Sequence, residues 1–174
     1  MGEFTAAGFS HSTQTGDHLL LGRAAEAAQN YPLALQQYRQ ALQMQPNSIA
    51  IVGDLVVHPV PYVYDGYPSE WTETLRRLVE LNAATIVPGH GPVMHDSTYL
   101  SLLRELFASA CTQVNDALRK TGPAMFRTVD DIESAVDLTS FRRRFAGNDA
   151  ALAAEFDRAT AQVIRVVFRE ASLR

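Results

Sequence analysis

Two short runs of apolar, mostly β-branched residues, at 48–57 and 84–87, lie on either side of one amphipathic stretch at 69–82. Both runs are bounded by proline or glycine, as is typical of short buried strands. In the stretch between them, Trp71 and Leu75 fall at helical spacing. A strand, a helix and a strand in this order favour a right-handed crossover that joins two parallel strands. The pattern predicts a helix-dominated α/β fold with a small sheet of two or three strands.

Helical patterns account for most of the remaining chain. Residues 17–47 predict an N-terminal helical hairpin, with helices at about 17–29 and 32–45 and a break at Asn30-Tyr31-Pro32. Residues 96–174 predict a C-terminal helical tail. Its expected helices cover about 97–120, 129–136, 138–145 and 149–171. Expected N-terminal caps are Ser69 for the helix at 69–82, Asp96 or Ser97 for the helix at 97–120, and Asn148 or Asp149 for the last helix.

Composition excludes several classes of protein. The chain has 174 residues and a net charge of −4, which disfavours a nucleic-acid-binding surface. Its one cysteine, Cys111, cannot form an internal disulfide, and we expect it to be a core residue. No apolar run is long enough to span a membrane. Residues 1–16 match no periodic pattern and predict a flexible leader or a cloning scar without a secretory signal, so the expected compartment is the cytoplasm.

The hairpin at 17–47 resembles a single tetratricopeptide repeat. The residues that carry the resemblance are Leu21-Gly22, Tyr31, Ala34, Tyr38, Ala41 and Pro46. The resemblance implies a module that binds a peptide or protein partner, with Tyr38 and Gln37 as candidate contacts. Such repeats bind through a groove built from several stacked units, and only one is present in this sequence. The alternative is an amphipathic hairpin, with Leu35 and Tyr38 on its inner face, that covers another apolar surface of the same protein.

Two residues capable of metal or acid–base chemistry are expected at the same edge of the sheet. Asp54 lies in or just after the first strand, and His90 lies in the turn after the second. The carboxyl ends of parallel strands meet at one edge, where the sites of α/β proteins usually form. An aspartate inside an apolar strand has to pair, bind metal or lie at a strand end, because unpaired burial is costly.

These motifs resemble the C-terminal half of the metallo-β-lactamase superfamily. The resembling residues are Gly53-Asp54, the helix that contains Trp71, and the run from Ile86 to Pro92 with its Gly-His-Gly turn. In that superfamily the aspartate bridges two divalent metal ions and the histidine binds one of them. The resemblance therefore implies that Asp54 and His90 are metal ligands, that the cofactor is zinc, and that residues 48–174 form a metallo-β-lactamase-like portion.

The sequence also departs from that family. The main ligand motif, His-x-His-x-Asp-His, is absent, as is the separate histidine that usually follows it, and His58 and His95 do not match the missing positions. A catalytic zinc normally has three protein ligands and a water, whereas this chain supplies two. The expectation is a hybrid or truncated protein with weakly bound zinc or none, and with little or no catalysis by a single chain.

Two alternatives remain open at this point. Another chain could complete the site around Asp54 and His90, which implies a zinc-dependent hydrolase of an ester, lactone or thioester. Alternatively, the hairpin at 17–47 could serve as a protein-interaction module. Because two strands are too few for a free-standing sheet and leave an exposed edge, we expect a homodimer or a higher oligomer.

Overall fold

A computed structural model describes residues 17–18, 20–44, 49–121 and 129–173 of the chain. The expected leader at 1–16 and the junction between the two expected portions, at 46–48, lie outside the described residues. A helical segment at 20–27 comes first. The elements that follow are α2 (Tyr31–Met44), β1 (Ile49–Val57), α3 (Pro68–Glu80), β2 (Thr85–His90), α4 (Thr98–Thr121), α5 (Val129–Ser134), α6 (Thr139–Ala146) and α7 (Ala150–Ser172). The helix-dominated α/β class expected from the sequence is confirmed.

Within the described residues the sheet has two strands, and they run parallel, as the strand–helix–strand order predicts. Ile49 of β1 pairs with Thr85 of β2, and the register shifts twice on the way to the last pair, Val57 with His90. The sequence placed His90 in a turn after the second strand, and this expectation is wrong. The strand continues through Pro88 to His90 because the His90 carbonyl accepts a hydrogen bond from the His58 N–H, at 3.1 Å.

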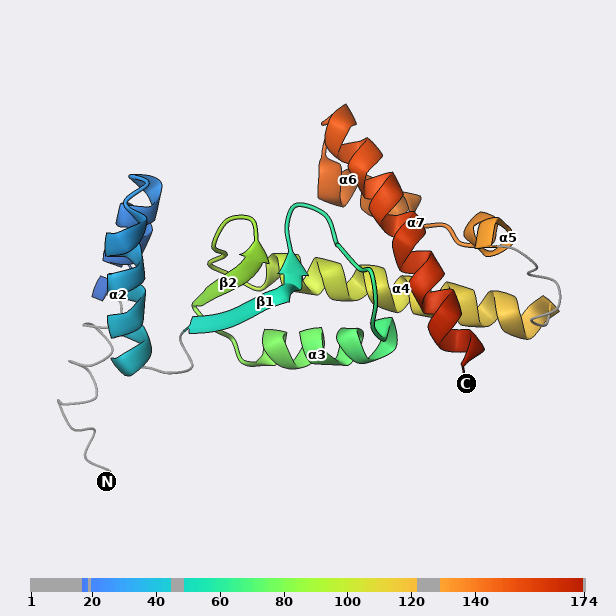
Figure 1. The fold of residues 1–174 in the computed structure, drawn as a ribbon, viewed down its shortest axis with the longest axis horizontal. Coiled ribbons are helices and arrows are strands. Elements are labelled where there is room, and N and C mark those ends of the chain that lie inside the picture. Colours follow the sequence, from blue (N-terminus) through green and yellow to red (C-terminus); the bar gives the residue numbers. More distant parts are fainter. Residues whose placement is uncertain (1–16, 19, 45–48, 122–128, 174) are drawn as a thin grey trace, which may run out of the picture.

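The main core lies where α3, α4 and α7 pack together, and Val52 and Val56 of β1 join it on the side where α3 contacts the strand (Figure 1). Phe107 of α4 and Phe156 of α7 are fully buried there, and Phe107 packs against Trp71 of α3 with ring centroids 5.4 Å apart. The inward-facing stripes expected for α4 and α7 are confirmed at their fully buried positions, namely Leu100, Leu103, Phe107, Ala110, Val114, Phe156, Val163, Val166 and Val167. The C-terminal helices therefore stabilise the layer that supports the sheet. Cys111 is partly buried against this core, as expected.

The start of α3 is stabilised from the far end of the chain. Ser69 is not the N-cap expected from the sequence, because Tyr67 occupies that position without a capping side-chain bond and Pro68 begins the helix. Instead, the Ser69 N–H donates to a Glu170 carboxylate oxygen at 3.1 Å, and the Ser69 hydroxyl donates to the other oxygen. Glu170 belongs to α7 and is buried. The Asp149 cap expected for α7 is confirmed, with hydrogen bonds from two backbone N–H groups.

The N-terminal helices pack against the two strands rather than against the main core. A second apolar cluster joins Ala25, Ala34, Tyr38 and Ala41 to Ile49 of β1, with Val87 of β2 partly buried beside them. The Arg23 guanidinium adds a hydrogen bond to the Ala84 carbonyl, at 3.2 Å. Leu35, expected on the inner face, is 51% exposed.

None of the helices in the described parts of the chain is long and apolar enough to cross a membrane.

Candidate functional site

The backbone of β1 changes direction at Gly53, one residue before Asp54. Gly53 has a φ of +53°, and the strand register shifts on both sides of it. A positive φ is a conformation that glycine adopts at little cost and that side-chain-bearing residues rarely adopt. Because of this bulge, the Asp54 side chain is 79% exposed although its strand is largely apolar. A buried Asp54 would have needed a partner for its charge. Because Asp54 is exposed, the protein does not need such a partner for stability.

The structure brings Asp54 and His90 together, as the parallel arrangement predicts. Nε2 of His90 lies 3.6 Å from Oδ1 of Asp54, and the His90 side chain is 70% exposed. This distance exceeds that of a good hydrogen bond. Two ligand atoms on one tetrahedral zinc, each about 2.1 Å from the ion, would lie roughly 3.4 Å apart. The separation therefore fits two corners of one zinc coordination sphere.

The close approach of the two strands depends on Gly89, the residue before His90. A Cβ at position 89 would lie 2.1 Å from Oδ1 of Asp54, 2.7 Å from the Gly53 carbonyl carbon and 2.8 Å from the Asp54 nitrogen. No atoms can remain at such distances, and two of these neighbours are backbone atoms. Glycine is therefore needed immediately before His90, because any side chain at position 89 would occupy the space of the Asp54 carboxylate.

The other two histidines near the sheet have different environments. His58 follows β1, and its ring packs against the Tyr99 ring with centroids 4.9 Å apart. Burial lowers the pKa of His58 below its ordinary value. His95 is exposed, and its pKa is lowered mainly by desolvation and also by the charge of Arg23.

Within the described residues, no group of three or more His, Cys, Asp and Glu side chains is placed to hold a metal ion. A catalytic zinc normally takes three ligands from a protein, and in the described residues Asp54 and His90 would offer two. In comparisons with known proteins, no protein-family model, no curated protein and no solved structure matches the chain.

The two residues of the hairpin that were predicted to contact a partner, Tyr38 and Gln37, have different environments. Tyr38 is buried, and its hydroxyl donates to Glu26 at 2.9 Å; burial and this hydrogen bond raise the pKa of Tyr38 to about 12. The Gln37 amide oxygen lies 2.7 Å from Nδ1 of His18. An apolar groove of about 400 Å³ runs between α2 and the strands, with the exposed side chains of Tyr31, Leu35 and Ile51 in its wall.

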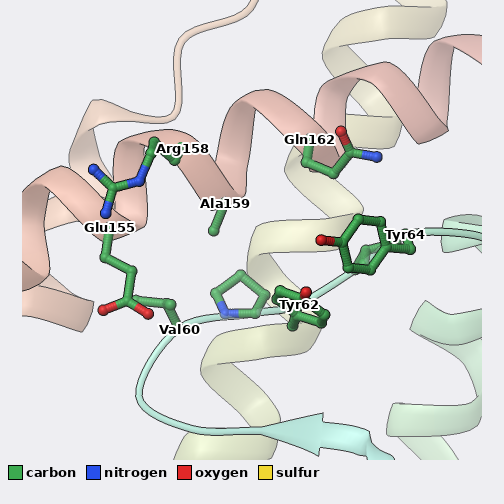
Figure 2. Close-up of a pocket in the computed structure, with 9 residues that line it drawn as sticks. Val60, Tyr62, Tyr64, Glu155, Arg158, Ala159 and Gln162 are labelled. Atoms are coloured by element: carbon green, nitrogen blue, oxygen red, sulfur yellow. The ribbon is translucent and has the colours of Figure 1, made fainter.

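A second groove, which the sequence did not predict, lies between the loop after β1 and one face of α7 (Figure 2). The loop contributes Val60 and Pro61 and the rings of Tyr62 and Tyr64, which meet edge to face at 4.7 Å. Glu155, Arg158, Ala159 and Gln162 of α7 form the opposite wall. A hydrogen bond with Tyr64 raises the pKa of Tyr62. The prolines and aromatic residues of 58–68 indicate an ordered loop in the sequence. They do not indicate that this loop faces α7.

Proposed function

We propose that residues 48–174 form a metallo-β-lactamase-like portion with an incomplete metal site, joined to a tetratricopeptide-like hairpin at 17–47. In this proposal Asp54 and His90 are the metal ligands that the chain retains, and a single chain has little or no hydrolytic activity. The observation that carries the proposal is the 3.6 Å separation of the two ligand atoms at the carboxyl edge of a parallel strand pair.

The donor set is that of a partial zinc site. A carboxylate oxygen and an imidazole nitrogen are both ordinary zinc ligands. Zinc bound by three protein ligands supplies a Lewis acid and an activated water. With two ligands that are both well exposed, the chain can orient an ion but cannot enclose it or exclude bulk water. Weak binding and slow or absent turnover follow from this geometry.

Zinc affinity measured on tag-free protein by competition with a chromophoric chelator tests the proposal. We expect weak binding to the wild-type chain and at least tenfold weaker binding to the Asp54→Ala and His90→Ala variants. His95→Ala is the matched control, because His95 is another exposed histidine and lies outside the pair. Equal binding by all four proteins would remove Asp54 and His90 as ligands. Rapid zinc-dependent hydrolysis by a monomer would refute the incomplete site.

One observation favours a zinc-dependent hydrolase completed by another chain as a second candidate. The pair is open to solvent, so a ligand from a different protein could reach the third position. Ester, lactone and thioester substrates are the classes to assay. Turnover that appears only when a second protein is added, and that is lost in His90→Ala, would favour this candidate over the inactive hybrid.

The apolar groove beside α2 favours the hairpin as an interaction module, which is the third candidate. Exposed Tyr31, Leu35 and Ile51 offer an apolar surface to a peptide. Binding of a peptide library to the full chain, with Leu35→Asp as the variant and Leu81→Asp as an exposed control on another element, tests it. Loss of binding in Leu35→Asp alone supports the module.

A further inference from the structure

We propose that Asp54 and His90 are half of a divalent-metal site that a second copy of this chain completes, so that one zinc ion links two chains across a twofold axis. This inference rests on the proposed role of the two residues as metal ligands and names the partner that completes their site. It predicts a dimer that exists only with metal, rather than one that the strand edge forms by itself.

One chain carries half of the ligands that a closed zinc site needs. Zinc in structural sites is four-coordinate, with all four ligands from protein. One chain supplies two, and the separation of their ligand atoms, 3.6 Å, is close to the roughly 3.4 Å edge of a zinc tetrahedron. A twofold axis through the ion brings the same two ligands from a second copy and fills the remaining two corners. The interface is then isologous and closes at the dimer.

The Asp54 and His90 side chains are accessible to a second chain. Both ligand side chains are more than two-thirds exposed, so the pair lies on the surface rather than inside a cleft. A Cβ added at Gly53, next to Asp54, would have no neighbour within 4 Å among the described atoms. A second chain can therefore approach the ligands directly, which it could not do if they lay at the bottom of a pocket.

The strand that carries Asp54 also exposes apolar side chains. Ile51 and Leu55 lie on the same strand as Asp54 and are 74% and 38% exposed. In the described part of the sheet, β1 pairs only with β2. The other edge of β2 has a neighbour, because Ile86 forms an antiparallel bridge with Met94. Ile51 faces the groove beside α2, and the Leu55 carbonyl accepts a hydrogen bond from Trp71, so what these residues offer a second chain is their exposed apolar side chains rather than a free backbone edge. Without metal, two copies of a chain with net charge −4 repel each other weakly, and the ion adds positive charge between the two Asp54 carboxylates.

A site closed by four protein ligands has no open position for water or substrate. Such an ion stabilises an assembly and does not activate a nucleophile, because a catalytic zinc keeps one position open. The proposed dimer therefore agrees with little or no hydrolysis, and it separates this inference from the hydrolase candidate, in which three ligands and a water are needed.

The test is a zinc titration of the full, tag-free chain followed by sedimentation velocity. We expect the mass to double from 19.2 kDa and the change to end at one zinc per two chains. Addition of a chelator should restore the monomer. Cobalt in place of zinc gives a second readout, because four-coordinate cobalt absorbs visible light far more strongly than six-coordinate cobalt. The intense bands should appear together with the dimer.

Variants separate this inference from the proposed function. Asp54→Ala and His90→Ala should remain monomeric at zinc concentrations at least tenfold above those that dimerise the wild type, and His95→Ala should dimerise normally. Ile51→Ser should fold, bind cobalt and dimerise several-fold more weakly. Circular dichroism of every variant confirms that it folds.

The possible results of these experiments decide between the zinc-linked dimer and the proposed function. Zinc bound by Asp54 and His90 at one ion per monomer, without a change in mass, overturns the dimer and leaves the proposed function intact. Zinc binding that neither variant weakens overturns both, whereas a complete lack of zinc binding overturns the dimer and the ligand role of Asp54 and His90 but leaves the inactive hybrid standing. A dimer that persists in chelator and in His90→Ala overturns the metal link. A doubled mass with a six-coordinate cobalt spectrum overturns the four-ligand site.

Discussion

The contact between Glu170 and the start of α3 provides the sharpest test of what holds this fold together. Glu170 is 5% exposed and accepts hydrogen bonds from both the N–H and the hydroxyl of Ser69, which lies 101 positions earlier in the chain. The carboxylate thus serves as the cap that α3 does not obtain from its own residues. We expect Glu170→Ala to destabilise the protein by about 1.5–3 kcal/mol.

The magnitude has three parts. Hydrogen bonds to a charged group contribute about 1.5–3 kcal/mol, and a carboxylate near the N-terminus of a helix contributes about 0.3–1 kcal/mol more. Removing the negative charge of Glu170 from the last turn of α7 stabilises that helix by a similar amount, about 0.3–1 kcal/mol. The reason is that a negative charge near the C-terminus of a helix interacts unfavourably with the helix dipole. Glu170→Gln keeps the shape and one acceptor, so we expect a smaller loss of about 1–2 kcal/mol.

Urea unfolding followed by tryptophan fluorescence measures this loss. Trp71, the only tryptophan of the chain, lies in α3 and donates a hydrogen bond to the Leu55 carbonyl at 3.0 Å, so its emission reports the contact of α3 with β1. With a slope of about 2–3 kcal/mol per molar urea, the midpoint of Glu170→Ala should fall by roughly 1 M. Glu155→Ala, at an exposed position of the same helix, is the control and should change stability by less than about 0.5 kcal/mol.

A double-mutant cycle with Ser69→Ala assigns the effect to this pair. Residues in one hydrogen-bond network show coupling energies of about 0.5–3 kcal/mol, whereas independent residues add within about 0.5 kcal/mol. If Glu170→Ala and Ser69→Ala are additive, or if Glu170→Ala matches the Glu155→Ala control, then the nonlocal cap does not stabilise α3 and the reasoning is wrong.

Three further predictions concern the site, the hairpin and the core. Gly89→Ala should cost about 1–3 kcal/mol in urea unfolding and weaken zinc binding at least tenfold, because its Cβ would displace Asp54; wild-type zinc affinity in this variant would contradict the close approach. Because the pKa of Tyr38 is raised, the contribution of Tyr38 to stability is fully present below pH 10 and is lost as the pH rises toward 12, so melting temperatures across this range should fall further for wild type than for Tyr38→Phe; parallel curves would contradict burial of the hydroxyl. Phe107→Ala should cost about 3–5 kcal/mol and shift the emission of Trp71 to longer wavelength, because it opens a cavity against the indole; a thermal melt within about 1 kcal/mol of wild type would contradict close packing there.

The elements of the fold could be predicted from the sequence because their signals are local. The β-branched run before Pro59 predicts a strand at 48–57, and β1 is Ile49–Val57. The apolar periodicity of α4 predicts 97–120, and the helix is Thr98–Thr121. In both cases the residues that decide the structure lie within the element and at its ends, so the prediction is accurate to one residue.

The prediction fails where a residue distant in sequence decides the local structure. Ser69 has the local features of an N-cap, but Glu170 of α7 accepts its hydrogen bonds, and Pro68 begins the helix one residue earlier. Likewise, the Pro88-Gly89-His90 run indicates a turn, yet the chain stays extended because the neighbouring strand hydrogen-bonds to His90. Helical periodicity placed Leu35 inside the hairpin, but the small area offered by two strands leaves it exposed.

The sequence predicts which residues form the candidate site, but it does not predict their geometry. Parallel strands predict that Asp54 and His90 share an edge, but the bulge at Gly53 that exposes the carboxylate depends on pairing between the strands. From the sequence, an aspartate within an apolar strand was expected to pair, to bind metal or to lie at a strand end. In the structure the carboxylate is solvated, and an exposed pair with His90 contributes at most about 1 kcal/mol to stability. Neither burial nor pairing therefore requires these two side chains at this edge. Their separation of 3.6 Å is longer than that of a good hydrogen bond, so the proposed role as ligands predicts that Asp54→Ala and His90→Ala weaken zinc binding while leaving the free energy of unfolding within about 1 kcal/mol of wild type.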